Sequence, residues 1–300
     1  MRRAATPFGL AAVLLAAAAV LLAAAAVLVG GAASASAAQP QDVQDRRPGY
    51  SWVSTYAGWT VWSERVDGSH LLFARHSGTT RLLAAPPSRV THDPGAGRGP
   101  DGRPAAVYQR CSGASCEIWA VDLATGRQRK VRGLGEIRRE TKAASDDDFT
   151  GWETHPRIWG NRVAFKTGGS AKSLPRLRVG PSATGGGAVK TLRVDPQDDG
   201  GDMKQLALGP RQIVAYWEDD FCFGRCAGLY IHGLVSGRQQ LLDDAAGTGD
   251  CIATIEDVRF DGKAFRWTRE LTAIESGATN CPPKINRLRY DPRSGRRTAS

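Results

Sequence analysis

A unit of about fifty residues recurs along this chain, and the repeat restricts the fold more than any other feature of the sequence. It is clearest in residues 99–131, GPDGRPAAVYQRCSGASCEIWAVDLATGRQRKV: a turn, a strand ending in an aromatic residue, a loop, an alternating strand and a Gly turn. The aromatic recurs 46 to 57 residues apart, as Trp62, Tyr108, Phe165, Tyr216 and Trp267. The turn recurs as Ser77-Gly78, Thr125-Gly126, Ser236-Gly237 and Ser294-Gly295, with a looser Gly185-Gly186-Gly187 in the third copy. This period is typical of propeller blades.

Each copy is preceded by a further strand-like segment, such as residues 201–209 and 252–260, which makes four strands per unit, A to D. One four-stranded sheet cannot bury both of its faces alone, whereas radial packing of several sheets buries them against each other. We therefore predict an all-β fold, a β-propeller of four-stranded antiparallel blades. The repeat gives five blades, and residues 39–56 and 133–158 leave a degenerate sixth blade open.

The best copy resembles the TolB-type, WD40-like β-propeller repeat. The match lies in Pro100-Asp101-Gly102, Tyr108, Ile118-Trp119, Asp122-Leu123 and Thr125-Gly126. The fifth copy repeats Asp261-Gly262 and Tyr290-Asp291, while the fourth has Gly-Pro and His232-Gly233 at the corresponding places. The resemblance implies the fold over residues 50–300 and a secreted bacterial member. It does not imply one function, because such repeats occur in periplasmic scaffold proteins and in gating domains of peptidases.

The N-terminal segment has the three-part layout of a secretory signal peptide. A basic start precedes an apolar run, residues 8–29, and then small-residue sites around Ala35 and Ala37. We expect a Sec signal over residues 1–38, a single propeller domain over 39–300, and a secreted or cell-envelope location. The apolar run is about long enough to span a bilayer, so membrane attachment is left open if the segment is not cleaved.

The composition narrows the set of partners. The chain has 40 Lys and Arg against 30 Asp and Glu, a net charge of +10, which suits acidic wall polymers or simply solubility. No Lys/Arg-rich run is interleaved with aromatics, so we expect no nucleic acid partner. We expect a monomer that binds an extracellular or envelope protein, or a wall glycan.

Six cysteines in an exported chain indicate disulfides. In the repeat, B–C loops lie on the same face as the D–A linkers between blades, and we call this the linker face. Two cysteine pairs bracket B–C loops and a third joins a linker to a B–C loop, which predicts Cys111–Cys116, Cys222–Cys226 and Cys251–Cys281. A zinc site formed by the first two pairs is the rejected alternative.

The linker face also collects acidic and aromatic residues, which makes it the candidate binding site. Its predicted ligand-contacting residues are Asp146, Asp147, Asp148, Trp152, Asp198, Asp199, Asp202, Trp217, Asp219 and Asp220. Clustered carboxylates can hold calcium through oxygen ligands, but DPQDDGGD (195–202) lacks the order of an EF-hand loop. We expect no cofactor and no dedicated metal site, and calcium is the one ion left open.

Catalytic motifs are missing from the sequence. There is no Gly-x-Ser-x-Gly elbow, no His-Glu-x-x-His and no phosphate loop, and His92-Asp93 is most simply a structural pair. We therefore expect a non-catalytic module that binds through its acidic, aromatic and disulfide-stiffened linker face. The alternative is a carbohydrate-active enzyme, a glycosidase or lyase, that uses the funnel carboxylates Glu153, Asp202 and Glu256.

Overall fold

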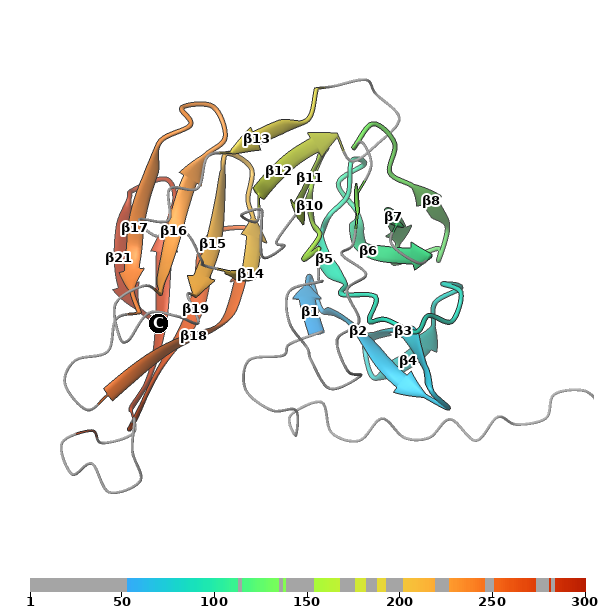
Figure 1. Cartoon of the computed structure of the whole chain (residues 1–300), viewed down its shortest axis with the longest axis horizontal. Helices are drawn as coiled ribbons and strands as arrows, with labels where there is room; N and C mark the ends of the chain where they lie inside the picture. The colour runs from blue at the N-terminus through green and yellow to red at the C-terminus, as the bar shows by residue number, and fades with distance from the viewer. Residues whose placement is uncertain are drawn as a thin grey trace, which may run out of the picture. The chain divides into compact units, whose positions relative to one another are not determined.

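A computed structural model describes the placement of residues 53–112, 115–134, 137–138, 154–167, 176–181, 188–192, 202–218, 227–245, 251–273, 281 and 284–300. All regular secondary structure in these residues is β strand (Figure 1). Among them, no helix is long and apolar enough to cross a membrane. The predicted signal segment lies outside the described residues.

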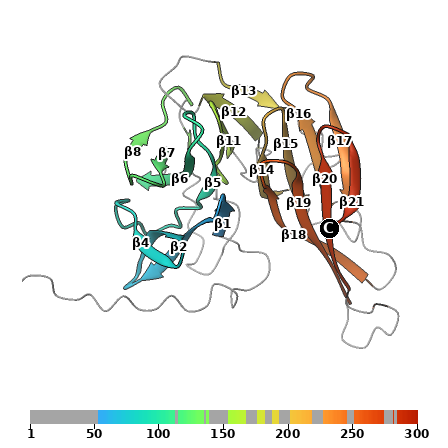
Figure 2. The ribbon, with the colours of Figure 1, turned by 180° about the vertical axis from the view of Figure 1, so that it is seen from behind.

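Within each of the three four-stranded sheets, the strands follow one another in chain order. The first sheet contains β1 (Val53–Tyr56), β2 (Trp59–Val66), β3 (Ser69–His76) and β4 (Thr79–Leu82). The last two sheets contain β14 (Asp202–Leu208), β15 (Gln212–Glu218), β16 (Gly228–Gly233) and β17 (Gln239–Asp244), then β18 (Cys251–Phe260), β19 (Phe265–Ala273), β20 (Lys284–Asp291) and β21 (Arg296–Ala299). These two sheets overlap in both views (Figures 1 and 2), and their residues pack together in a shared core.

A larger sheet in the middle of the chain joins two further meanders. One contains β5 (Gly95–Arg98), β6 (Pro104–Ser112), β7 (Ser115–Asp122) and β8 (Gln128–Lys130), with β9 (Ile137–Arg138) paired to β7. The other contains β10 (Arg157–Trp159), β11 (Arg162–Thr167), β12 (Arg176–Pro181) and β13 (Lys190–Leu192). A parallel pairing of Trp159 with Arg98 connects them through β10 and β5, whereas all other pairings are antiparallel. The all-β class and the four-stranded antiparallel unit are confirmed, and the number of blades stays a prediction.

The repeated aromatic residues occupy equivalent positions in the core. All five lie on the second strand of a meander, β2, β6, β11, β15 or β19, and none is more than 3% exposed. The predicted Ser/Thr-Gly turns join third and fourth strands, and Gly126, Gly237 and Gly295 have φ between 67° and 75°, the left-handed region that glycine tolerates. The predicted turn at Gly185-Gly186-Gly187 lies outside the described residues. The repeat therefore marks structurally equivalent strands.

Successive sheets share their cores, which explains why the inner strands are apolar on both faces. Along β15, Ile213, Ala215 and Trp217 pack with residues of β11, β12 and β14. The alternate residues, Val214 and Tyr216, pack with residues of β18 and β19. Because side chains alternate across a strand, one meander contributes to two neighbouring clusters.

Two glycines allow β5 to approach β10. A Cβ atom on Gly95 would lie 2.0 Å from the carbonyl oxygen of Pro156, and one on Gly97 would lie 2.0 Å from that of Ile158. Neither position tolerates a side chain unless the backbone moves. The two glycines thus allow β5 and β10, the first strands of their meanders, to lie in direct contact.

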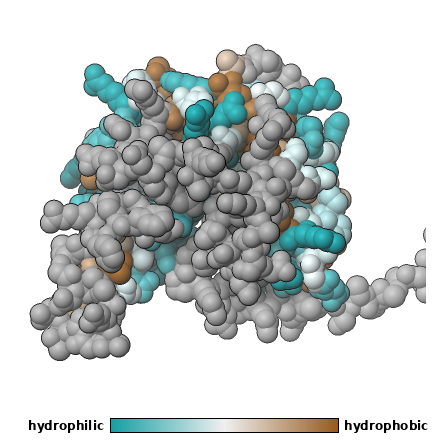
Figure 3. Space-filling view, in the orientation of Figure 1, coloured by the Kyte–Doolittle hydropathy of each residue, from teal (hydrophilic) through white to brown (hydrophobic). Residues whose placement is uncertain are grey.

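The described surface is largely polar. Its large exposed apolar side chains are Val66, Leu82, Val235, Leu241, Ile252 and Ile285. On the face that Figure 3 shows, described hydrophobic atoms form small groups among hydrophilic ones. Scattered exposed apolar residues of this kind are normal for a folded protein and do not themselves mark an interface.

Candidate functional site

Two disulfides close loops on the linker face. Cys111 and Cys116 join the ends of β6 and β7, with their Cα atoms 4.0 Å apart. Cys251, the first residue of β18, is bonded to Cys281, which lies shortly before β20. These two predicted pairs are confirmed, and Cys222 and Cys226 lie outside the described residues. Disulfides are compatible with an extracellular or envelope location.

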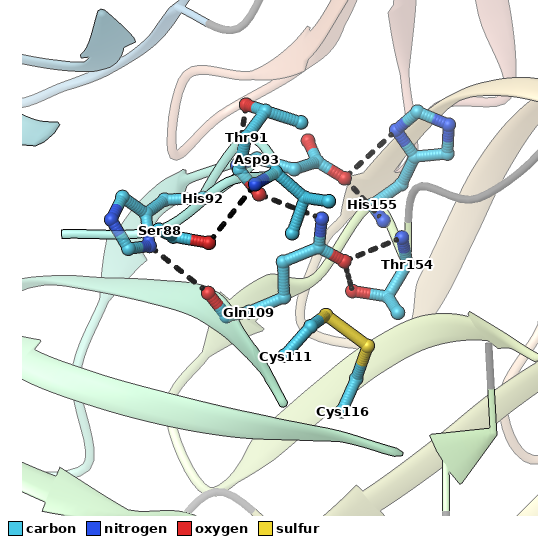
Figure 4. The surroundings of a disulfide bond; sticks show 10 residues. Ser88, Thr91, His92, Asp93, Gln109, Cys111, Cys116, Thr154 and His155 are labelled. Carbon is cyan, nitrogen blue, oxygen red and sulfur yellow. Dashed lines mark hydrogen bonds and ion pairs between the residues drawn. A yellow bond between two sulfur atoms is a disulfide. The ribbon is translucent and has the colours of Figure 1, made fainter. Parts of the chain in front are cut away.

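A buried glutamine ties two interblade linkers together behind the first disulfide (Figure 4). Gln109 on β6 is 2% exposed, and its Nε2 donates to the carbonyl oxygen of Thr91 at 2.9 Å. Its Oε1 accepts from the Thr154 hydroxyl at 3.0 Å and from the Thr154 backbone nitrogen at 3.2 Å. One side chain therefore fixes the linker before β5 to the linker before β10.

A buried carboxylate makes a second tie between the same linkers. Asp93 Oδ2 accepts from the backbone N–H of His155 at 2.5 Å and lies 3.2 Å from His155 Nδ1. Arg157 Nη1 lies 3.9 Å from Asp93 Oδ1, and Arg157 Nε donates to the carbonyl oxygen of Leu206 on β14 at 2.7 Å. Burial alone would raise the pKa of Asp93, but His155 and Arg157 together hold it below its ordinary value.

The geometry of His92 and His155 is that of structural groups. Asp93 is 2% exposed, His155 is 8% exposed, and both have positive φ angles near 41°. His92 is fully buried, its pKa is lowered chiefly by burial, and its Nδ1 lies 3.2 Å from the carbonyl oxygen of Gln109. Because a carbonyl only accepts, Nδ1 of His92 carries a proton and donates it to this oxygen. The His92-Asp93 dipeptide therefore supports the linkers.

The acidic loops of the predicted site fall mainly outside the described residues. This applies to Asp146, Asp147, Asp148, Trp152, Asp198, Asp199, Asp219 and Asp220. Asp202 begins β14, where its Cα pairs with that of Glu218 on β15. Trp217 is 3% exposed and packs in the core rather than on the surface. In the described part of the chain, no group of three His, Cys, Asp or Glu residues could hold a metal ion.

The funnel carboxylates are partly described. Glu153 lies outside the described residues, and Asp202 and Glu256 lie on the first strands β14 and β18. Burial raises the pKa of Glu256, and the neighbouring carboxylates of Glu270 and Asp257 raise it further. A carboxyl group whose pKa is raised keeps its proton to a higher pH than usual, which is the property of a general acid.

A set of basic residues on the side of the sheets opposite the linker face was not predicted from the sequence. The A–B and C–D turns lie there, and we call this side the turn face. The residues missed are Arg211, Lys263, Arg289 and Arg293, which line one cavity. Basic residues in the turns of the fourth and fifth copies were the available signal, but each turn taken alone reads as a solvated loop.

No protein-family model matches the chain, and no curated protein matches it. Its fold is similar to several solved structures at low identity. TolB from Acinetobacter baumannii is 12% identical, with a TM-score of 0.44, 74% of this chain covered and 51% of that one. An oligogalacturonate lyase in complex with manganese is 13% identical, with a TM-score of 0.44 and coverage of 80% and 61%. Oligopeptidase B from Trypanosoma brucei is 14% identical, with a TM-score of 0.46 and coverage of 82% and 33%.

The chain thus spans between a third and three fifths of the length of these structures. They include a TolB, a lyase and an oligopeptidase. At these identities and scores, the likeness carries no inference about what this chain binds or does.

Proposed function

We propose that the protein is a non-catalytic propeller module, exported to the cell envelope or medium, that binds a partner through its linker face. The partner is an extracellular or envelope protein, or a wall glycan. The observation that carries the proposal is that two buried side chains and two disulfides hold the linkers and loops of this face in place. Gln109 and Asp93 hold the linkers before β5 and β10 together. The Cys111–Cys116 and Cys251–Cys281 bonds close loops on the same face.

These contacts support binding because loops that are already held in place lose less conformational freedom when a partner docks. Ordering loops at an interface costs about 0.5–1.5 kcal/mol for each immobilised side chain, so loops held in advance bind more tightly. The Asp–His contact that could suggest catalysis is used to hold the linkers. The acidic residues of the loops would then supply the charge that selects the partner, with calcium as an optional ion among them.

The experiment is a capture from the envelope and medium of the source organism, with the disulfide-intact protein as bait. Bound proteins and glycans are identified by mass spectrometry. The test variants are Asp198→Asn with Asp199→Asn, and Asp219→Asn with Asp220→Asn. The matched control, Asp101→Asn with Asp291→Asn, removes the same charge from the turn face. We expect a specific partner that is kept by the wild type and the control and lost by a test variant. A partner lost equally by the control, or none at all, would contradict the proposal.

One observation favours the carbohydrate-active alternative. Glu256 has a raised pKa, and a glycosidase needs one carboxyl group that stays protonated to serve as a general acid. This alternative predicts turnover of a glycan that is abolished by Glu256→Gln and by Asp202→Asn or Glu153→Gln. Turnover that survives all three substitutions would exclude these carboxylates as the site.

A further inference from the structure

A cavity of about 890 Å³ opens on the turn face, between the sheet of β14–β17 and the sheet of β18–β21. Three segments line it. They are the β14–β15 turn at residues 210–212, the β18–β19 turn at 260–265 and the end of β20 with the following turn, at 289–293. Its volume lies in the range of small-ligand sites, which is about 300–1,000 Å³.

The cavity is strongly basic. Arg211, Lys263, Arg289 and Arg293 line it together with one acidic residue, Asp291. Asp291 is already engaged, because its Oδ1 accepts from the backbone N–H of Arg293 at 2.8 Å. Within the described part of the chain, none of the four cationic side chains forms an ion pair.

Cations just outside the cavity behave differently. Arg266 Nε lies 2.5 Å from Asp261 Oδ2, and Arg162 Nη1 donates to the carbonyl oxygen of Pro210 at 2.7 Å. The neighbouring arginines are therefore paired within the protein, whereas the described residues supply no carboxylate partner for the four cavity cations. That contrast distinguishes the cavity from the general positive charge of the chain.

Two buried polar atoms at the cavity also lack partners in the described residues. They are Arg289 Nε, which can only donate, and Gln212 Oε1, which can only accept. A buried polar atom without a hydrogen bond is destabilising, so a ligand that satisfies both atoms gains affinity. Such a ligand presents an oxyanion to Arg289 and a hydroxyl group to Gln212.

The apolar wall of the cavity is preformed. Phe265 is fully buried, and its ring centroid lies 4.7 Å from that of Phe260. The ring of Trp159, from β10, packs edge-on against Phe260 at 4.7 Å. A Cβ atom on Gly209 would lie 2.9 Å from Phe265 Cζ, so the wall is packed tightly from behind.

We propose that this cavity binds a small hydroxylated polyanion, one whose negative charge is carried by carboxylate or phosphate groups and which has a hydroxyl that donates to Gln212 Oε1. The four cations hold the oxyanions, and Arg289 Nε donates to one of them. Both carboxylates and phosphates fit this chemistry, and the test separates them. The site lies on the turn face, so it is independent of partner binding at the linker face and either proposal can fail alone.

Titration calorimetry on the disulfide-intact protein at low ionic strength tests the proposal with four probes. Citrate carries three carboxylates and a hydroxyl, tricarballylate carries the carboxylates without the hydroxyl, glucose 6-phosphate carries hydroxyls and a phosphate, and glucose is neutral. We expect saturable 1:1 binding of citrate or glucose 6-phosphate and none of glucose. Binding of citrate alone assigns a polycarboxylate, and binding of the phosphate ester alone assigns a phosphorylated ligand.

Tricarballylate should bind about tenfold more weakly than citrate, since one hydrogen bond of about 1.4 kcal/mol corresponds to that factor. Arg211→Gln with Lys263→Gln, and Arg289→Gln alone, should each weaken binding at least tenfold. The matched control is Arg127→Gln with Arg129→Gln, which removes two exposed charges from the β7–β8 turn and strand β8 and should leave the affinity within twofold. Failure of both citrate and glucose 6-phosphate to bind, or equal weakening in the control, would overturn the proposal. Equal affinity for citrate and tricarballylate would overturn the role of Gln212.

Discussion

Asp93 Oδ2 lies 2.5 Å from the backbone nitrogen of His155 and 3.2 Å from its Nδ1, so a single buried oxygen holds both the backbone and the ring of one linker residue. The two residues are 62 positions apart in the chain and precede different first strands, β5 and β10. This contact joins two meanders at the linker face and makes a direct prediction about stability.

Asp93→Asn should destabilise the fold by about 3 kcal/mol, because it removes the buried negative charge that accepts from the His155 backbone and lies beside Arg157. Asparagine tolerates the positive φ of this position, so the substitution tests charge rather than backbone strain. Urea unfolding at pH 7, followed by tryptophan fluorescence, measures the change. The exposed Asp101→Asn serves as the control, and a loss below 0.5 kcal/mol for Asp93→Asn, on the scale expected of surface substitutions, would show that the pair does not hold the linkers.

The same carboxylate gives a pH dependence with a defined sign. The pKa of Asp93 is lower in the folded protein than the ordinary value of 3.8. Its contribution to stability is therefore complete above that ordinary value and is lost as the pH falls through the lower, folded pKa. Wild type and Asp93→Asn should differ most at neutral pH and converge in acid.

His232 should make the protein lose stability at a higher pH than Asp93 does. The side chain on β16 is 1% exposed, and burial lowers its pKa from 6.5 to about 4. Between these values the unfolded chain binds a proton that the folded protein does not, so stability is full above pH 6.5 and falls as the pH drops towards 4. The loss attributable to His232 between pH 7.5 and pH 5 is about 2 kcal/mol.

Urea unfolding of wild type and His232→Gln at pH 7.5 and pH 5 checks this expectation. The variant can be less stable at both values, so the measured quantity is the difference between them. That difference should be about 2 kcal/mol smaller in the variant. His70, whose pKa is also lowered to about 4, first by burial and then by His92 and Arg65, is unchanged and retains its own share. An identical pH dependence in both proteins would mean that His232 titrates normally.

Gly97→Ala tests the contact between β5 and β10. The added Cβ would lie 2.0 Å from the carbonyl oxygen of Ile158, so the two strands must separate. Overpacking of this kind typically costs about 1–3 kcal/mol. The control is Gly68→Ala, where φ is +80° and no atom lies within 4 Å, so only backbone strain is added. Thermal unfolding should place Gly97→Ala below the control, and the reverse order would argue against the tight approach of the strands.

The sequence predicted the strands well because the repeat records a local pattern. Each aromatic of the series that includes Trp62 and Trp267 lies on a second strand, and the Ser/Thr-Gly pairs lie at the turns before the fourth strands. Alternation within one strand was also visible. These properties depend on residues that are close together along the chain, so they can be read from the sequence.

The exposure of particular side chains was harder to predict. Trp217 was assigned to the binding face because it precedes acidic residues at the end of a strand, yet it faces the core shared with β11 and β14. In a sheet buried on both sides, alternation says which neighbour a side chain meets but not whether water reaches it. The basic cavity was missed for a related reason, since its three segments, 210–212, 260–265 and 289–293, meet only when two sheets pack.

The two described disulfides should differ in their contribution to stability. In the chain-entropy model, stabilisation grows with the length of the loop that a disulfide closes. Cys111 and Cys116 are 5 positions apart, which gives about 2 kcal/mol, whereas Cys251 and Cys281 are 30 positions apart, which gives about 3.7 kcal/mol. Cys251→Ser with Cys281→Ser should therefore lower the midpoint of urea unfolding more than Cys111→Ser with Cys116→Ser.

Non-reducing peptide mapping of the wild type supplies the pairing against which both variants are compared. It should find the two described bonds and the predicted Cys222–Cys226 bond in a single species. Mixed pairings, such as Cys116 with Cys222, would contradict the predicted set of three pairs. If the pairing is as expected but the short loop contributes more than the long one, native contacts around Cys111 and Cys116, where Gln109 ties the linkers, must outweigh chain entropy.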